Sequence, residues 1–311
     1  MRALADDSAA VTARAPAKVN LQLSVGARRP DGYHDLVNVF HAVSLYDEVT
    51  AYPADTFGLT VSGEGASTVP ADDRNLAARA AHTLADHVGR PPRVRLHVRK
   101  AIPVAAGMAG GSADAAAGLV ACDALWNTGL SRADLLELAA GLGSDVPFAL
   151  LGGTAVGTGR GDRLTAAMAR GDYHWVLAFA TGGLSTPTVY AQLDRIRGGR
   201  VLPEPNLSPA LMAALRAGDA RGLGVALSND MEAAALILRP GLRRTLAAGR
   251  EHGALGAMVS GSGPTCAFLA RDEEAAVDLA VALSGAGVCR TVRRVRGPAP
   301  GARLVEAGVG G

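Results

Sequence analysis

The sequence predicts an α+β fold organised in two domains, and three observations support this. Segments that alternate like strands and segments with helical periodicity follow one another in both halves of the 311-residue chain, without an internal repeat. The composition, 49% hydrophobic and 19% charged, is typical of a globular protein that buries a sizeable core. A glycine-rich stretch at residues 152–161 interrupts the pattern, so we predict an N-terminal domain at residues 1–161 and a C-terminal domain at residues 162–311.

The first predicted strand, residues 18–25, alternates strictly between polar and apolar residues, which is typical of a half-buried strand. Lys18 and Asn20 lie on its polar face. Residues 1–14 before it are expected to be a disordered leader. The elements predicted next are a turn at 28–33, strands at 36–50, 59–62 and 94–98, and a helix at 75–88.

A loop of small residues at 103–111 leads into an alanine-rich helix predicted at 112–125. Ser131 begins another predicted helix, with Asp134 as its capping-box partner, because this spacing pairs the two side chains with the free N–H groups of the first turn. Residues 144–147 have the pattern of the cap and first turn of a further short helix.

The second half shows the same mixture of elements. Strands are predicted at 175–180, 256–260, 266–269 and 288–295. Helices are predicted at 187–195, 209–216, 222–229, 240–251 and 273–283. Residues 298–311 are expected to form a frayed tail.

Charge and composition exclude several classes of function. A net charge of +2 argues against a nucleic-acid partner bound by bulk charge. The chain has no signal-peptide-like apolar core near its start and no run of about 18 uncharged apolar residues, so we expect a cytoplasmic protein without a membrane partner. Its three cysteines lack metal-ligand spacing and are expected to be buried reduced thiols, so no metal site is assigned.

The basic residues are strongly biased: of 31 Lys and Arg, 29 are arginine and two are lysine, Lys18 and Lys100. Arginine and lysine serve about equally well as solubilising surface charge, so the bias points to genome composition. Lysine differs chemically because it offers a compact ammonium that fits against a phosphate or an alkoxide. The two lysines are therefore candidates for a specific role.

Residues 107–112, Gly-Met-Ala-Gly-Gly-Ser, open the alanine-rich helix. Glycines let a backbone approach a ligand closely, and a helix N-terminus offers free N–H groups to an anion. The pattern is neither a P-loop nor the dinucleotide motif G-x-G-x-x-G. From these residues alone, a phosphate cradle and a tight packing turn both remain open.

Three further features also allow two interpretations. The small-residue loop at 260–265 fits a ligand loop or an ordinary hairpin. The Lys18 and Asn20 pair fits a site or a solvated strand face. Asp145 either complements a helix dipole or acts as a positioned base.

Together these motifs resemble one family, the GHMP-superfamily small-molecule kinases. The sequence Pro-Ala-Lys-Val-Asn at 16–20, the loop and helix start at 107–114, and Ser-Gly-Ser-Gly-Pro-Thr at 260–265 occur in the family's order. Within the superfamily the chain is most similar to kinases of isoprenoid precursor biosynthesis that act on a cytidine diphosphate ester of methylerythritol. The motifs that carry this are R-P-D-G-Y-H at 29–34, G-S-D-V-P-F at 143–148, S-T-P-T-V-Y at 185–190 and S-N-D-M-E at 228–232.

The resemblance implies a two-domain GHMP kinase fold, with a ribosomal-protein-S5-like N-terminal domain that binds ATP and a ferredoxin-like C-terminal domain. It implies ATP-dependent phosphorylation of the 2-hydroxyl of that ester, with Mg²⁺ accompanying the nucleotide. The partner is then a small-molecule substrate, with no nucleic acid and no membrane, and the protein a monomer or weak homodimer. Another GHMP kinase acting on homoserine, mevalonate or a sugar, and a non-catalytic ATP-binding regulator, are the alternatives.

The resemblance also implies roles for individual residues. Asp145 matches the catalytic base and Lys18 its charge partner. The positions that match the ATP site are Asn75, Leu76, Lys100, Pro103, Val104, Ala105, Ala106, Gly107, Met108, Ala109, Gly110, Gly111 and Ser112. The positions that match the substrate site are Asn20, Tyr33, His34, Asp145, Thr186, Tyr190, Gly261 and Ser262. The chain departs from the pattern with alanine at 105, 106 and 113, which affects the finer phosphate and metal contacts.

Overall fold

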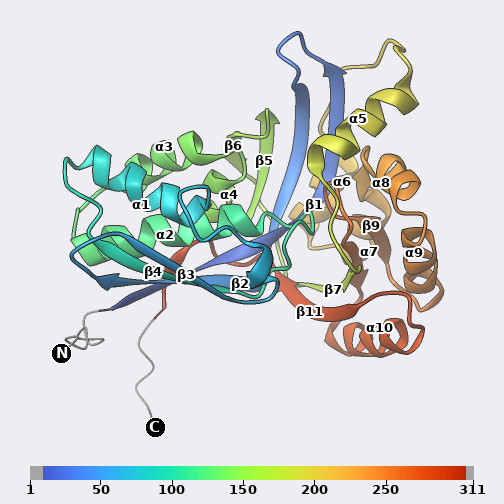
Figure 1. Ribbon diagram of the computed structural model, residues 1–311. Coiled ribbons are helices and arrows are strands. Elements are labelled where there is room, and N and C mark those ends of the chain that lie inside the picture. Colours follow the sequence, from blue (N-terminus) through green and yellow to red (C-terminus); the bar gives the residue numbers. More distant parts are fainter. Residues whose placement is uncertain (1–9, 306–311) are drawn as a thin grey trace.

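Eight strands form the larger of two sheets in the computed structural model, which describes residues 10–305 (Figure 1). Its main path runs β12-β1-β2-β4-β3, while β5 pairs with β2 and β6, and β8 pairs in parallel with β1. The strands are β1 (Val11–Arg28), β2 (His34–Pro53), β3 (Gly58–Gly63), β4 (Val94–Lys100), β5 (Thr154–Gly159), β6 (Arg163–Ala166), β8 (Ser228–Asn229) and β12 (Arg303–Leu304). Long β1 and β2 form an antiparallel pair that connects the two parts of the molecule (Figure 1).

The second sheet has four antiparallel strands in the order β11-β7-β10-β9. They are β7 (Tyr173–Phe179), β9 (Gly256–Val259), β10 (Cys266–Ala270) and β11 (Thr291–Gly297). Helices separate β7 from β9 and β10 from β11, and the first of these strands lies beside the last. This is the β-α-β-β-α-β arrangement of a ferredoxin-like domain, as the resemblance implies.

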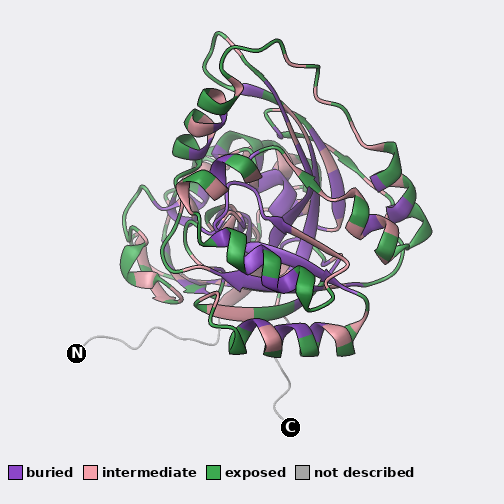
Figure 2. Cartoon of the chain, turned by 90° about the vertical axis from the view of Figure 1, so that its right-hand side faces the viewer, coloured by how far each residue is buried: buried purple, intermediate pink, exposed green. Residues whose placement is uncertain are grey.

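The helices pack on the sheets with their buried sides inward (Figure 2). In the first part these are α1 (Leu76–His87), α2 (Gly110–Trp126), α3 (Arg132–Leu142) and α4 (Val146–Leu151), with a 3₁₀ turn at Ala66–Thr68. In the second part they are α5 (Thr186–Arg197), α6 (Pro209–Ala217), α7 (Ala220–Ala226), α8 (Glu232–Leu238), α9 (Leu242–Glu251) and α10 (Glu273–Gly285). None of the helices in residues 10–305 is long and apolar enough to cross a membrane.

Strand β7 lies between two cores because its side chains alternate. Trp175 and Leu177 belong to the main core, which the larger sheet shares with α1, α2 and α6. Val176 and Ala178 point the other way, into a second core with α8, α9 and α10. The second sheet is therefore buried on both faces, and one of those faces joins it to the larger sheet.

Strand β1 differs from the half-buried strand expected of its alternation. Its polar residues Lys18, Asn20 and Gln22 are only 6%, 1% and 3% exposed. Gln22 donates from Nε2 to the Asn206 carbonyl oxygen (2.6 Å) and accepts from the Ser208 amide (2.9 Å). Residues distant in the sequence thus cover the polar face, and the expectation of a half-buried strand was wrong.

Both chain ends of the described region are more ordered than expected. Val11–Arg14, within the expected leader, belong to β1 and pair with β2. In the expected frayed tail, β12 pairs with β1, and Ala302 is buried and donates from its amide to the Ala149 carbonyl oxygen (2.9 Å). The prediction of disorder was wrong for residues 10–14 and 298–305, while residues 1–9 and 306–311 lie outside the described residues.

The glycine-rich stretch at 152–161 contains strand β5, which pairs with β2 and β6. Along the chain, the strands of the larger sheet therefore continue as far as Ala166 before the first strand of the second sheet begins at Tyr173. The division of the chain at residue 161 stays a prediction. The helix expected at 222–229 ends at Ala226, since Ser228 and Asn229 pair with β1; α8 was not predicted.

Candidate active site

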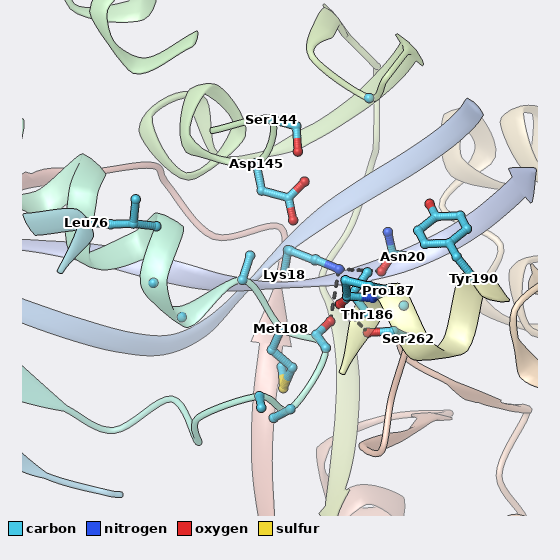
Figure 3. A pocket seen from close by; sticks show the side chains of 18 of the residues that line it. Lys18, Asn20, Leu76, Met108, Ser144, Asp145, Thr186, Pro187, Tyr190 and Ser262 are labelled. Carbon is cyan, nitrogen blue, oxygen red and sulfur yellow. Dashed lines mark hydrogen bonds between the residues drawn. The ribbon is translucent and has the colours of Figure 1, made fainter. Parts of the chain in front are cut away.

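A cavity of about 820 Å³ lies where the two parts of the molecule meet, and it brings together nearly every predicted site residue. Its walls come from β1, β2, the loop at 103–109 (the phosphate loop), the starts of α2, α4 and α5, and the loop at 260–265. Of the predicted residues, only Ser112 is outside the lining; it lies in the first turn of α2. Figure 3 shows side chains from these elements facing a common space.

The phosphate loop has a backbone conformation that would allow an anion to approach it closely. Ala105, Gly107 and Ala109 all have positive φ, and Ala109 is the N-cap of α2. A Cβ on Gly107 would collide with the Ser260 carbonyl oxygen and lie 2.9 Å from the Gly263 amide nitrogen, so only glycine fits there. The 17-residue helix α2 begins at the cavity, which Gly110 and Gly111 line, and the free N–H groups in the first turn of a helix favour an anion such as phosphate.

Lys18 joins β1 to the phosphate loop. Its Nζ donates to Asn20 Oδ1 (2.6 Å) and to the Gly107 carbonyl oxygen (2.9 Å) (Figure 3). Asn20 Nδ2 in turn donates to Asn38 Oδ1 (2.8 Å), which fixes the amide so that its oxygen faces the ammonium. Burial lowers the pKa of Lys18, and the charge of Asp145 partly opposes this. Lys18 is thus a desolvated cation held at the floor of the cavity.

Asp145 faces Lys18 across the cavity (Figure 3). It occupies the N-cap position of α4, but its side chain makes no capping hydrogen bond. No described cation lies within 4.0 Å of its carboxylate, so it acts on Lys18 through a longer-range charge interaction. Of the two interpretations left open by the sequence, these contacts favour a carboxylate available to a ligand over one that caps a helix.

One end of the cavity lies beside α1 and α2 and is lined by Asn75, Leu76 and Lys100. Asn75 caps α1, because its Oδ1 accepts from the Ala77 amide (2.8 Å). Leu76 lies close to Gly111, so the two helices meet here with little space between them.

The ammonium of Lys100 does not point freely into the cavity. It bonds to Asp47 and to Asp114 Oδ2 (2.7 Å), and Asp47 Oδ1 also accepts from the amides of Ala101 and Ile102 (2.6 and 2.8 Å). Burial raises the pKa of the Asp114 carboxyl to about 8, against the lowering effect of Lys100. This buried trio fixes the chain where it enters the phosphate loop.

The opposite end of the cavity is aromatic. The rings of His34 and Tyr190 stack with centroids 4.9 Å apart and an interplanar angle of 16°. His34 Nε2 bonds to Asp194 Oδ1 (2.9 Å), one helical turn after Tyr190 on α5, so the same helix face holds both rings. Tyr33 is half exposed at the mouth. These rings offer flat faces suited to a nucleobase.

The loop at 260–265 closes the cavity from the second sheet. Ser262 Oγ and Thr186 Oγ1 are 2.9 Å apart, which connects the loop to the start of α5. Asn229 Nδ2 donates to the carbonyl oxygens of Val259 and Gly261 (2.7 and 2.8 Å), and Glu232 Oε2 accepts from the Val259 amide (2.8 Å). The motif at 228–232 therefore positions this loop and does not itself line the cavity, apart from Met231.

Several lining residues were not predicted from the sequence. Of these, Asn38 could have been predicted most easily, because it is a polar residue within an apolar strand segment. Asp114 carried a weaker signal as an acidic residue in an alanine-rich helix. Arg28 and Arg160 had none, because arginine is the ordinary surface cation of this chain.

Comparison with known proteins shows that both parts of the chain match kinase family models. The model of the GHMP kinases N terminal domain matches residues 75–153, and that of the GHMP kinases C terminal matches residues 211–289. A Cytophaga hutchinsonii homoserine kinase structure, 20% identical with a TM-score of 0.73, covers 95% of this chain and 97% of its own. At that identity it supports the fold alone.

More similar relatives include proteins named 4-diphosphocytidyl-2-C-methyl-D-erythritol kinase. The Streptomyces coelicolor protein is 60% identical over 297 residues, covering 95% of this chain and 99% of its own. The Mycolicibacterium smegmatis protein is 59% identical over 299 residues, with 96% and 93% covered. A crystal structure of 4-(cytidine 5'-diphospho)-2C-methyl-D-erythritol kinase matches with a TM-score of 0.74 at 35% identity, covering 92% of this chain and 98% of its own. The chain therefore belongs to the GHMP kinases and, among them, to the 4-diphosphocytidyl-2-C-methyl-D-erythritol kinase family.

Proposed function

We propose that this protein transfers the terminal phosphoryl group of ATP to the 2-hydroxyl of 4-diphosphocytidyl-2-C-methyl-D-erythritol, in non-mevalonate isoprenoid precursor biosynthesis. The observation that carries the proposal is the position of Lys18 and Asp145. They face each other between a phosphate loop on one side and an aromatic end on the other. That is where an acceptor hydroxyl and a terminal phosphate would have to meet.

Asp145 accepts the proton of the 2-hydroxyl as its oxygen forms a bond to the γ-phosphorus. The bond between the γ-phosphorus and the β,γ-bridging oxygen breaks, and ADP leaves with that oxygen. Lys18 offsets the negative charge on the acceptor oxygen and is the charge partner of Asp145 across the cavity. Asn20, which is fixed by Asn38, keeps the ammonium in place and lies within reach of the same hydroxyl.

ATP would lie with its phosphates along residues 103–111 and its base near Leu76. Asn75 and Lys100 would act there mainly by shaping the pocket, since their side chains already have hydrogen-bond partners. Mg²⁺ bound with the nucleotide would offset the negative charge of its phosphates; we assign it no side-chain ligand. Ser112 would contribute through the first turn of α2.

The cytosine of the substrate would occupy the aromatic end formed by Tyr33, His34 and Tyr190. Thr186, Gly261 and Ser262 would contact the substrate from the second part of the molecule. A homoserine, mevalonate or sugar kinase has no use for such an aromatic pocket, and a non-catalytic regulator has no need of the Lys18 and Asp145 pair. Both alternatives are therefore disfavoured.

We further propose that the enzyme acts in the cytoplasm as a monomer or weak homodimer, without a nucleic-acid or membrane partner. The free thiols of Cys122 and Cys266 are buried, which is compatible with a reducing compartment.

Turnover of the cytidyl ester with ATP and Mg²⁺, followed as ADP release, tests the proposal. The Asp145→Asn variant should lose kcat by at least about 100-fold, because the amide cannot take the proton. Its affinity for ATP, measured by calorimetry, should stay unchanged. A wild-type protein that phosphorylates homoserine and not the ester would reject the proposed substrate, and a fully active Asp145→Asn variant would reject the base.

A further inference from the structure

Two arginines at the mouth of the cavity carry charges that no nearby carboxylate offsets. Arg28 ends β1, and Arg160 lies in the turn between β5 and β6; both are exposed and both line the cavity. Within residues 10–305, neither guanidinium lies within 4.0 Å of a carboxylate oxygen. Asp162, the nearest acidic residue in sequence to Arg160, accepts instead from the Arg160 backbone amide (3.2 Å).

The other cations of the lining are already compensated. Lys100 bonds to Asp47 and Asp114, and Arg74 pairs with Asp72. Lys18 faces the carboxylate of Asp145 across the cavity, and the charge of Asp145 partly opposes the lowering of the Lys18 pKa by burial. The positive charge that remains for a ligand outside the nucleotide end is therefore concentrated on Arg28 and Arg160.

Arg160 is held in a geometry that leaves its donors available. Its guanidinium carbon lies 3.8 Å from the centroid of the Tyr33 ring. A guanidinium that stacks on an aromatic ring makes the contact with its face and keeps the N–H groups along its edge available. Its side chain donates no hydrogen bond to any described residue. Arg28 contacts the residue before this tyrosine: its Nε donates a long hydrogen bond to the Gly32 carbonyl oxygen (3.5 Å), and its other N–H groups have no described partner. A planar edge with unpaired N–H groups suits two oxygens of one phosphate.

We propose that Arg28 and Arg160 bind the diphosphate of the acceptor substrate and so make the enzyme specific for a nucleoside diphosphate ester. The inference rests on the proposed function, which puts cytosine at Tyr33, His34 and Tyr190 and the reacting hydroxyl at Lys18 and Asp145. The diphosphate connects those two parts of the substrate, and Arg28 and Arg160 line the same cavity next to the proposed cytosine site, Arg160 against Tyr33 and Arg28 against Gly32. The phosphates of ATP are bound at a different place, by the phosphate loop and α2.

The competing interpretation is that Arg160 only holds the Tyr33 ring in place. The two roles differ in the ligand they affect: loss of a diphosphate contact weakens CDP but not cytidine, whereas a displaced Tyr33 weakens both. The variants Arg160→Gln and Arg28→Gln remove the charge and keep a long polar side chain. The matched control is Arg29→Gln, since Arg29 is next to Arg28 but pairs with Asp31 and Asp35 and does not line the cavity.

The measurements are the KM values for the ester and for ATP, and the inhibition constants of CDP and cytidine against the ester at saturating ATP. Each cavity variant should raise the KM for the ester and the inhibition constant of CDP by about 5–30-fold, as expected for a lost charge-assisted hydrogen bond. Inhibition by cytidine and the KM for ATP should stay within about twofold, and Arg29→Gln should resemble the wild type.

Equal weakening of CDP and cytidine would overturn the diphosphate assignment, and so would unchanged binding of both. Direct calorimetric binding of CDP and cytidine to the same variants separates this inference from the proposed function. A wild-type protein that does not turn over the ester would reject the proposed function. The binding of the diphosphate by Arg28 and Arg160 is tested separately, by the ratio of the CDP and cytidine affinities, which can be measured whether or not turnover occurs.

Discussion

The two lysines of this chain lie in different surroundings, although composition alone singled out both. Lys18 faces the cavity with Asp145 opposite it, and its pKa is lowered by burial. Lys100 is enclosed by two carboxylates, which raise its pKa overall although burial alone would lower it. The rarity of lysine in the sequence indicated that both residues were unusual. It could not distinguish a lysine that faces the cavity from one that is held in a buried ion-pair cluster. That difference depends on Asp47 and Asp114, 53 and 14 residues away in the chain.

Lys18→Arg is expected to lower kcat/KM by on the order of 100-fold or more, although it conserves charge. The ammonium lies between Asn20, Gly107 and the loop at 260–265, and a Cβ placed on Gly261 would be only 3.1 Å from Nζ. A guanidinium is too large and too rigid for this space. Steady-state kinetics measures the effect, and the urea midpoint of the same variant shows whether it is folded. A folded Lys18→Arg enzyme with normal turnover would contradict the role given to this lysine.

Sequence patterns predicted those elements well whose stabilising hydrogen bonds lie within the element itself. The capping box of α3 is present as expected, with Ser131 Oγ accepting from the Asp134 amide and Asp134 bonding back to the Ser131 amide. Helix α1 begins at Leu76, directly after its N-cap Asn75, where the sequence predicted the helix to start. In contrast, β8 exists only because Ser228 and Asn229 pair with Gln22 and Leu23 of β1. No local pattern marks such a strand, so its residues were assigned to a helix.

The conformation of the phosphate loop depends on glycine at position 107, and Gly107→Ala tests this. Its φ is +76°, and an added Cβ would collide with the Ser260 carbonyl oxygen. We expect a loss of about 1–3 kcal/mol in the free energy of unfolding, together with a raised KM for ATP, because the loop must shift away from the second glycine loop. Urea denaturation and steady-state kinetics provide the two measurements.

Gly141→Ala is the matched control, since Gly141 lies within α3 and a Cβ there meets no atom within 4 Å. It should be neutral or stabilise the protein by up to about 1 kcal/mol. If Gly107→Ala behaves like Gly141→Ala, the loop is not constrained as described.

At the scale of the whole molecule, the two sheets meet around a buried histidine. His41 of β2 is fully buried, with its ring 5.7 Å from that of Tyr173 and 6.1 Å from that of Trp175, both on β7. Its Nδ1 bonds to Thr154 Oγ1 (2.8 Å). Gly297 of β11 passes so close that a Cβ would lie 2.8 Å from His41 Cδ2. The sequence predicted two mixed halves, but not this junction, because its residues come from four separated strands and none has a distinctive local pattern.

This junction should make the protein lose stability in mild acid. Burial lowers the pKa of His41 to about 3, against a smaller raising effect of the Gly297 backbone, while its ordinary value is 6.5. Between pH 3 and pH 6.5 the imidazole of His41 binds a proton in the unfolded chain but not in the folded protein. The contribution of His41 to stability is therefore fully present above about pH 6.5. As the pH drops toward 3, the free energy of unfolding falls by about 1.4 kcal/mol per pH unit. From pH 7 to pH 5 the wild type should therefore lose about 2 kcal/mol more than His41→Gln, which cannot titrate. Urea unfolding of both proteins at the two pH values measures this difference directly. Other acidic and basic groups titrate equally in the two proteins, so equal losses would mean that His41 accepts its proton in the folded state and that the junction tolerates a charge.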